Sequence, residues 1–208
     1  MQTKGVLVVV SGFSGAGKGT VMKALLNKYD NYALSVSATT RNPRPGEENG
    51  REYFFLTESQ FEDMIKNDEL IEHARYVDHY YGTPKKYVEE KMAAGKDVIL
   101  EIEIQGALNI KKKFPDALLV FIVPPTAEDL KKRLIGRGTE SAEVIEKRLR
   151  RAAEESDGMD SYDYIVVNDD IDTCVEDLHS LIRSSHFKES ANTDLVARMK
   201  QELHDMTK

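Results

Sequence analysis

Cysteine and long apolar runs are nearly absent from this sequence. Among 208 residues Cys174 is the one cysteine, so no internal disulfide can form and a disulfide-stapled fold is excluded. No Cys or His stands at metal-ligand spacing from it, which favours an ordinary helix residue. No stretch approaches the roughly 18 consecutive apolar residues of a membrane span, and Met1 to Lys4 lack the apolar segment of a signal peptide. We therefore expect a cytoplasmic protein with no membrane partner.

Excess positive charge is also lacking. The formal net charge is −7, which argues against general binding to nucleic acid or to anionic membranes, although a local basic cluster can still hold a phosphorylated ligand. Internal repeats and low-complexity tracts are missing too, which excludes solenoid arrays and disordered linkers. With 40% hydrophobic residues, the chain can bury one substantial core with a small inserted subdomain.

What is present is an alternation of strands and helices. A short β-branched run is followed by a Gly-rich turn and a helical pattern, and three later apolar runs are bounded by Gly, Pro, Asn or Asp. This order predicts an α/β fold with a mainly parallel sheet between helical layers, and with ligands beyond the carboxyl ends of the strands. The predicted strands are Gly5 to Val10, Asp97 to Ile104, Ala117 to Val123 and Tyr164 to Val167, and the first helix is Gly17 to Tyr29.

Two segments fit poorly as crossover helices, and we expect both to be insertions. Residues 37–94 open with a loop rich in Pro, Gly and Arg and contain aromatic clusters, which indicates a small separate lobe. Residues 126–158 are charged and helical, with Thr126 and Asp129 resembling a capping box, which indicates a mobile lid. The core then comprises residues 1–36, 95–125 and 159–188.

A helical tail is predicted over residues 189–208. Its apolar residues Leu195, Met199, Leu203 and Met206 fall on one stripe of a helix. We expect this stripe to dock on the core, with a subunit contact as the alternative.

The Gly-rich turn carries the most specific motif. It matches the GxxxxGK pattern and lies between a predicted strand and a predicted helix, where its backbone N–H groups and its lysine can surround the phosphates of ATP. Gly19 stands where a Mg²⁺-binding Ser or Thr is usual, so we expect Mg²⁺ to be held through water and nucleotide oxygens, with Thr20 as a phosphate contact. The predicted ATP-binding residues are Gly12, Phe13, Ser14, Gly15, Ala16, Gly17, Lys18, Gly19 and Thr20.

Two acidic residues end the second predicted strand. The period of two places Glu101 and Glu103 on one face, and buried parallel strands are normally apolar on both faces. A cleft, water-bound Mg²⁺ or a ligand amine would explain the pair. A structural ion pair with a Lys or Arg is the alternative.

Arginines and hydroxyl groups gather in the first insertion. Arg41 and Arg44 lie in a Pro-containing loop, and the planar guanidinium suits bidentate contact with a phosphate. The polar residues Ser37, Tyr53, Tyr81 and Thr83 add to a lining for a second anionic ligand.

The order of these motifs resembles the guanylate kinase family. The matching segments are Ser11 to Thr20, Ser37 to Arg44, Tyr80-Tyr81-Gly82-Thr83, Glu101 to Gly106, and Arg137-Gly138-Thr139-Glu140. The resemblance spans nearly the whole chain, with Phe13 in place of a more usual proline. It implies a P-loop fold and Mg²⁺-dependent transfer of the terminal phosphoryl group of ATP to GMP or dGMP, by a monomer or homodimer in purine metabolism.

The resemblance also implies roles for individual residues. Arg41, Arg44, Tyr53 and Tyr81 hold the GMP phosphate, while Ser37, Glu72, Thr83 and Glu103 read the guanine. Lys18, Arg41, Arg133, Arg137 and Arg148 supply positive charge to the transferred phosphoryl group, and Asn168 lies near the adenine of ATP. No residue is expected to bind the metal directly, and Glu101 and Thr20 are candidates for contact through water.

Two alternatives stay open. Gly-Lys-Gly-Thr also resembles adenylate-type nucleoside monophosphate kinases, which differ in base specificity. A catalytically silent guanylate-kinase-like module that binds proteins is the other, although such modules usually have degraded P-loops.

Overall fold

The computed structural model describes residues 4–76, 78–136 and 141–208. Its central element is a parallel sheet of five strands in the order β2-β7-β1-β8-β9. The strands are β1 (Leu7–Gly12), β2 (Tyr32–Leu34), β7 (Asp97–Glu101), β8 (Leu118–Val123) and β9 (Tyr164–Val167). The four strands predicted from the sequence are therefore confirmed, and the short edge strand β2 is an addition.

Helices cover both faces of this sheet, and the alternation along β1 decides which helix each residue meets. Val8 and Val10 pack in one cluster with α1 (Lys18–Lys28) and α7 (Ile171–Ser185). Leu7 and Val9 pack in the other with α3 (Lys85–Ala93) and α4 (Ile104–Lys113). Cys174 is fully buried in α7, and burial raises the pKa of its thiol to about 11, as befits an inert packing residue.

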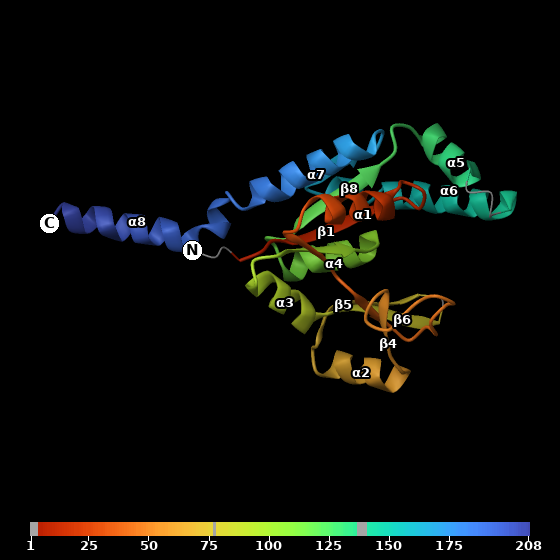
Figure 1. Cartoon of the computed structure of the whole chain (residues 1–208), viewed down its shortest axis with the longest axis horizontal. Coiled ribbons are helices and arrows are strands. Elements are labelled where there is room, and N and C mark those ends of the chain that lie inside the picture. The colour runs from red at the N-terminus through yellow and green to blue at the C-terminus, as the bar shows by residue number, and fades with distance from the viewer. Residues whose placement is uncertain (1–3, 77, 137–140) are drawn as a thin grey trace.

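A second, smaller sheet lies beside the core (Figure 1). Its strand order is β4-β3-β6-β5, with β3 (Ser37–Thr39), β4 (Tyr53–Phe55), β5 (Leu70–Tyr76) and β6 (His79–Pro84). Helix α2 (Glu58–Lys66) covers one face, where Phe61 packs with Ala38 and Leu70. The other face is turned toward the core (Figure 1).

A pair of helices, α5 (Ala127–Gly136) and α6 (Ala142–Ser156), extends from the far end of the core sheet (Figure 1). The Asp129 N–H donates to Thr126 Oγ1 at 3.1 Å at the start of α5, which is one half of the expected capping box, and the Thr126 hydroxyl donates to Asp129 Oδ2 at 2.6 Å. Leu130 and Leu134 pack with Phe13 of the Gly-rich turn. These two helices are thereby attached directly to the predicted ATP site.

One strand boundary corrects the sequence interpretation. Strand β7 ends at Glu101, and Glu103 is the N-cap residue of α4, so Glu101 and Glu103 do not share a strand face. The predicted strand is too long because Ile104 begins the helix instead of continuing the alternation.

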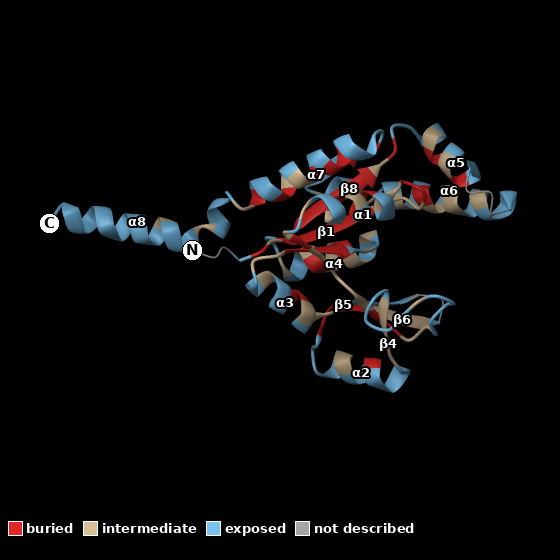
Figure 2. Cartoon of the chain, in the orientation of Figure 1, coloured by how far each residue is buried: buried red, intermediate tan, exposed pale blue. Residues whose placement is uncertain are grey.

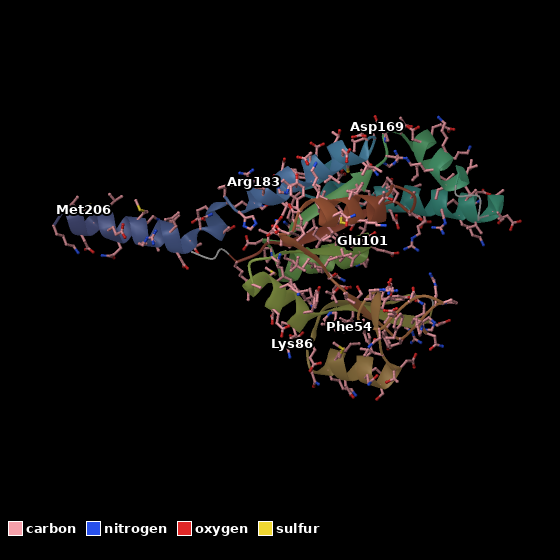
Figure 3. All side chains as sticks on the ribbon, viewed as in Figure 1. Phe54, Lys86, Glu101, Asp169, Arg183 and Met206 are labelled. Atoms are coloured by element: carbon pink, nitrogen blue, oxygen red, sulfur yellow. The ribbon has the colours of Figure 1, made fainter. Side chains whose placement is uncertain are left out.

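The C-terminal segment corrects a second expectation. After the short turn η2 (Glu189–Ala191), helix α8 (Thr193–Met206) extends away from the core and buries no residue (Figure 2). Leu195, Met199, Leu203 and Met206 are 43%, 45%, 58% and 81% exposed, and Met206 lies at the far end of the helix (Figure 3). The expected docking of this stripe on the core is therefore wrong. Among the described residues, no helix is long and apolar enough to cross a bilayer.

Candidate functional site

The Gly-rich turn joins the end of β1 to the start of α1. Gly12, Gly15 and Gly17 have φ of 152°, 98° and 90°, a region that L side chains rarely adopt. A Cβ on Gly17 would also lie 2.4 Å from Asn168 Nδ2. These glycines let the backbone turn back on itself directly before the positive end of a helix, which is the geometry of a phosphate-binding loop.

The Lys18 side chain folds back onto the loop and hydrogen-bonds to its backbone. Its ammonium group donates to the carbonyl oxygen of Gly12 at 2.6 Å and to that of Phe13 at 3.4 Å. The lysine charge is therefore held over the loop, where the outer phosphates of a nucleotide would lie.

Asn168 follows β9 and hydrogen-bonds to the backbone of the Gly-rich loop. It is only 4% exposed, and its side-chain N–H donates to the Ala16 carbonyl oxygen at 2.7 Å. This amide helps to fix the P-loop backbone, a contribution that the sequence did not reveal. Its predicted contact with adenine stays a prediction.

Arginines of α5 and α6 reach the same loop. Arg133 donates to the carbonyl oxygens of Asn168 at 2.7 Å and Ala16 at 3.4 Å, and Arg148 donates to Ser14 Oγ. The structure thus places both guanidinium groups at the P-loop, while their supply of charge to the transferred phosphoryl group stays a prediction. Arg137 lies outside the described residues.

Glu101 ends β7 next to the P-loop strand, with its Cα paired in register with Val10 of β1 (Figure 3). Although the strand end is open to solvent, the surrounding protein partly desolvates the carboxyl and raises its pKa, while the charge of Lys18 lowers it. No group of three or more metal-ligating side chains occurs among the described residues. An isolated carboxylate and the exposed Thr20 hydroxyl suit a Mg²⁺ ion that keeps waters and phosphate oxygens as its main ligands.

The second sheet presents hydroxyl groups on the face opposite α2. Ser37 is in register with Tyr53, and Thr39 with Tyr81. Because side chains alternate along each strand, Ser37, Tyr53, Tyr81 and Thr83 share one face. Ala38 and Phe54 lie on the apolar face with α2.

Glu72 of β5 joins this polar face deep inside the protein. It is 9% exposed, and Thr83 Oγ1 donates to Glu72 Oε1 at 2.9 Å. Burial raises the pKa of the Glu72 carboxyl, while the Thr83 hydrogen bond and the charge of Lys113 lower it. A Cβ on Gly106 of α4 would lie 3.4 Å from Glu72 Oε2, so the start of α4 borders this carboxylate. A carboxylate has about four acceptor sites, so Glu72 can accept donors from a ligand in addition to Thr83.

Arg41 has a partner that the sequence analysis missed. Its two terminal nitrogens donate to Glu47 at 2.9 and 3.0 Å, and its guanidinium lies 5.2 Å from the ring centre of Tyr53. The Glu47 carboxylate also accepts the Arg44 N–H at 2.7 Å. This last contact comes from the Arg44 backbone amide, so the bidentate geometry, which a phosphate would also satisfy, belongs to the Arg41 guanidinium. The signal for Glu47 was its place in the same loop as both arginines.

Glu103 is not part of an acidic strand face but of an ion pair. Arg151 of α6 contacts Glu103 Oε2 at 2.5 Å, in line with the structural alternative that the sequence left open. Glu103 is the N-cap residue of α4, and Gly106 in the first turn of the same helix borders Glu72.

A phosphate-binding loop at the carboxyl end of a parallel sheet, with arginines of a helical pair over it and a polar second sheet beside it, defines a P-loop nucleotide kinase. Comparison with known proteins specifies the family. The guanylate kinase family model matches residues 4–185, and the chain belongs to this family.

Individual relatives agree over most of their length. The chain is 47% identical over 202 residues to a guanylate kinase of Caldanaerobacter subterraneus subsp. tengcongensis, covering 97% of this chain and 98% of that protein. It is 50% identical over 188 residues to a guanylate kinase of Lactococcus lactis subsp. lactis, covering 90% of this chain and 92% of that protein. The crystal structure of a guanylate kinase from Anaplasma phagocytophilum superposes with a TM-score of 0.71 at 32% identity, covering 90% of this chain and 89% of that one.

Proposed function

We propose that this enzyme transfers the terminal phosphoryl group of ATP to GMP or dGMP, with the P-loop holding ATP and the polar face of the second sheet holding the acceptor. The observation that carries this assignment is the buried Glu72 carboxylate, hydrogen-bonded to Thr83 on that face. A buried acid needs compensation, and guanine supplies it with the N1–H and N2–H donors.

Glu72 distinguishes guanine from adenine by hydrogen-bond chemistry. Adenine presents a lone pair at N1, so an acceptor would face an acceptor inside a desolvated pocket, at a cost of a few kcal/mol. The Ser37 hydroxyl suits the O6 acceptor of guanine, and Glu103 contributes a further acceptor. Thr83 donates its single hydroxyl hydrogen to Glu72 in this structure, so it would donate to O6 only after releasing that hydrogen bond.

The acceptor phosphate is assigned to the arginine loop. The Arg41 guanidinium and the Arg44 backbone N–H both donate to Glu47 in this structure, and the ring centres of Tyr53 and Tyr81 are 6.1 Å apart. We propose that the phosphate of GMP takes the place of the Glu47 carboxylate, because a dianion competes well for the same bidentate donors.

Phosphoryl transfer between two phosphates needs alignment and positive charge rather than a protein nucleophile. Lys18, Arg41, Arg133, Arg137 and Arg148 supply this charge. Mg²⁺ bound with ATP would neutralise further negative charge, and its protein contacts are assigned to Glu101 and Thr20 through water. The base and phosphate contacts do not involve the ribose, so the proposal extends to dGMP.

Water would compete with GMP as the acceptor. We propose that residues 37–94 form a GMP-binding lobe and residues 126–158 a lid, and that both close on the core before transfer. The enzyme would act in the cytoplasm, as a monomer or homodimer, in purine nucleotide metabolism, without nucleic-acid or membrane partners.

One assay tests the assignment. ADP release is measured with ATP, Mg²⁺ and GMP, AMP, CMP or UMP in turn. GMP should be the best acceptor by at least about a hundredfold, the discrimination expected from one mismatched buried hydrogen-bonding group. Preference for AMP would favour an adenylate-type kinase, and an absence of turnover would favour a silent binding module.

A further inference from the structure

Helix α6 carries two arginines that reach different parts of the core. Arg148 donates to Ser14 Oγ in the P-loop, while Arg151 contacts Glu103 at the start of α4. Residues three apart lie on the same side of a helix, so one face of α6 connects the ATP side of the site with the acceptor side.

The Arg151 guanidinium is held by two carboxylates, one in α6 and one at the start of α4. Its Nε donates to Glu155 Oε1 at 2.9 Å, within the same helix, while its Nη2 contacts Glu103 Oε2. Close packing supports the contact, because a Cβ on Gly158 would lie 2.9 Å from Ile104 Cγ2. The C-terminal end of α6 is therefore seated directly against the first turn of α4.

That first turn also borders the acceptor pocket. Gly106 approaches Glu72 Oε2, so the chain of contacts from Arg151 through Glu103 and α4 ends at the carboxylate assigned to guanine.

We propose that Arg151 is a positioning residue that makes ATP and GMP assist each other's binding, by holding the Glu103 carboxylate in place whenever the ATP phosphates fix α6. The inference rests on the proposed function, which supplies the two ligands. The coupling is expected to be positive, because one ligand orders groups that the other ligand needs in place. ATP phosphates that engage Arg148 immobilise α6, and Arg151 then orders Glu103 before GMP arrives, so GMP binding carries a smaller entropic cost. Thermodynamic linkage requires that bound GMP tightens the binding of ATP by the same factor.

The coupling free energy is expected to be small, because both side chains of the ion pair are exposed to solvent. The side chains of Arg151 and Glu103 are 40% and 63% exposed, and exposed ion pairs contribute little because water and salt screen them. We therefore expect coupling of about two- to fivefold in affinity, weakening as salt is added.

Calorimetry tests the proposal directly. GMP is titrated into the enzyme with and without a saturating non-hydrolysable ATP analogue and Mg²⁺, and the ratio of the two dissociation constants is compared among variants. The wild type should bind GMP about two- to fivefold more tightly with the analogue, by the limit given above. Arg151→Gln should bring the ratio to about one, and Arg151→Lys should retain part of it.

A neighbouring arginine provides the matched control. Arg150 pairs with Glu146 inside α6 at 2.6 Å, so Arg150→Gln removes the same charge from the same helix and should keep the wild-type ratio. Glu103→Gln should lower the ratio, and the double variant with Arg151→Gln should lower it no further.

The outcomes separate the two proposals. A wild-type ratio of one, a retained ratio in Arg151→Gln, or an equal loss in Arg150→Gln would overturn the coupling while leaving GMP turnover intact. Failure of the wild type to bind or phosphorylate GMP would overturn the proposed function itself.

Discussion

Replacing Glu72 by Gln changes the chemistry of the pocket with almost no change of shape. The substitution removes one negative charge and exchanges an acceptor oxygen for an N–H₂ donor, at a residue that is 9% exposed. Thr83 Oγ1, which donates to Glu72 Oε1 at 2.9 Å, can still donate to the amide oxygen. The remaining group toward guanine is then a donor that faces the donors N1–H and N2–H.

The expected magnitude follows from two losses. A hydrogen bond to a charged group contributes about 1.5–3 kcal/mol, and a buried donor left without an acceptor costs about 1–3 kcal/mol. Since the two losses overlap, we expect about 2–4 kcal/mol, which lowers kcat/KM for GMP by about 30- to 1000-fold. AMP should lose much less, because the new amide can donate to its N1 lone pair. The preference for GMP over AMP should therefore shrink.

Protein stability should move in the other direction. Burial raises the pKa of Glu72 above its usual value of 4.5, so the folded state holds a proton more tightly than the unfolded state does. For such a group stability falls as pH rises from 4.5 through the folded-state pKa, and the penalty for burying the charge is complete above it. Gln carries no such penalty, so Glu72→Gln should melt at the same temperature as the wild type or higher at pH 7.5.

Steady-state kinetics with GMP and AMP, together with thermal melting, check these expectations. Glu69→Gln is the matched control, because Glu69 is exposed and lies three residues before Glu72, so its kcat/KM should stay within about twofold of wild type. The reasoning would be refuted by a Glu72→Gln variant with wild-type kcat/KM for GMP, or by one whose lost activity merely tracks a lower melting temperature.

Further predictions concern the other parts of the molecule. Lys18→Met should lower kcat by about 100- to 1000-fold in the ADP-release assay, with folding intact by circular dichroism, and a near-normal kcat would contradict its role. Gly17→Ala should lower the melting temperature and weaken binding of an ATP analogue, because its φ is 90° and its Cβ would meet Asn168; unchanged values for both would argue against that strain. Deleting residues 193–208 should change the free energy of unfolding by less than about 1 kcal/mol, since α8 buries no residue, and a larger loss in denaturant titrations would reveal a hidden contact. Small-angle scattering should show compaction when GMP and the ATP analogue are added together, and an unchanged radius of gyration would refute domain closure.

Local pattern predicted the elements of the core well. An apolar β-branched run before a Gly-rich turn has one common structural outcome, so β1, the P-loop and α1 were foreseen within a few residues. The same reasoning failed at Glu103, because alternation predicts a strand for as long as it continues and does not reveal where a helix begins. It also missed Glu47, whose role depends on a loop that folds back onto Arg41.

The amphipathic tail shows another limit. A stripe of Leu and Met residues predicts that one face of a helix avoids water, but the pattern does not say which surface covers it. The structure places α8 away from the core, with that stripe exposed.

The class of the protein can be predicted from the order of its residues, because the phosphate-binding loop is a contiguous segment whose glycines and lysine act within a few residues of one another. The contacts between side chains far apart in the chain follow from the folded arrangement. Strand pairing in the second sheet brings Thr83 to Glu72, and the packing of α6 on α4 brings Arg151 to Glu103. Such contacts depend on register and burial over long separations in the chain, and the local preferences of the residues do not encode them one by one.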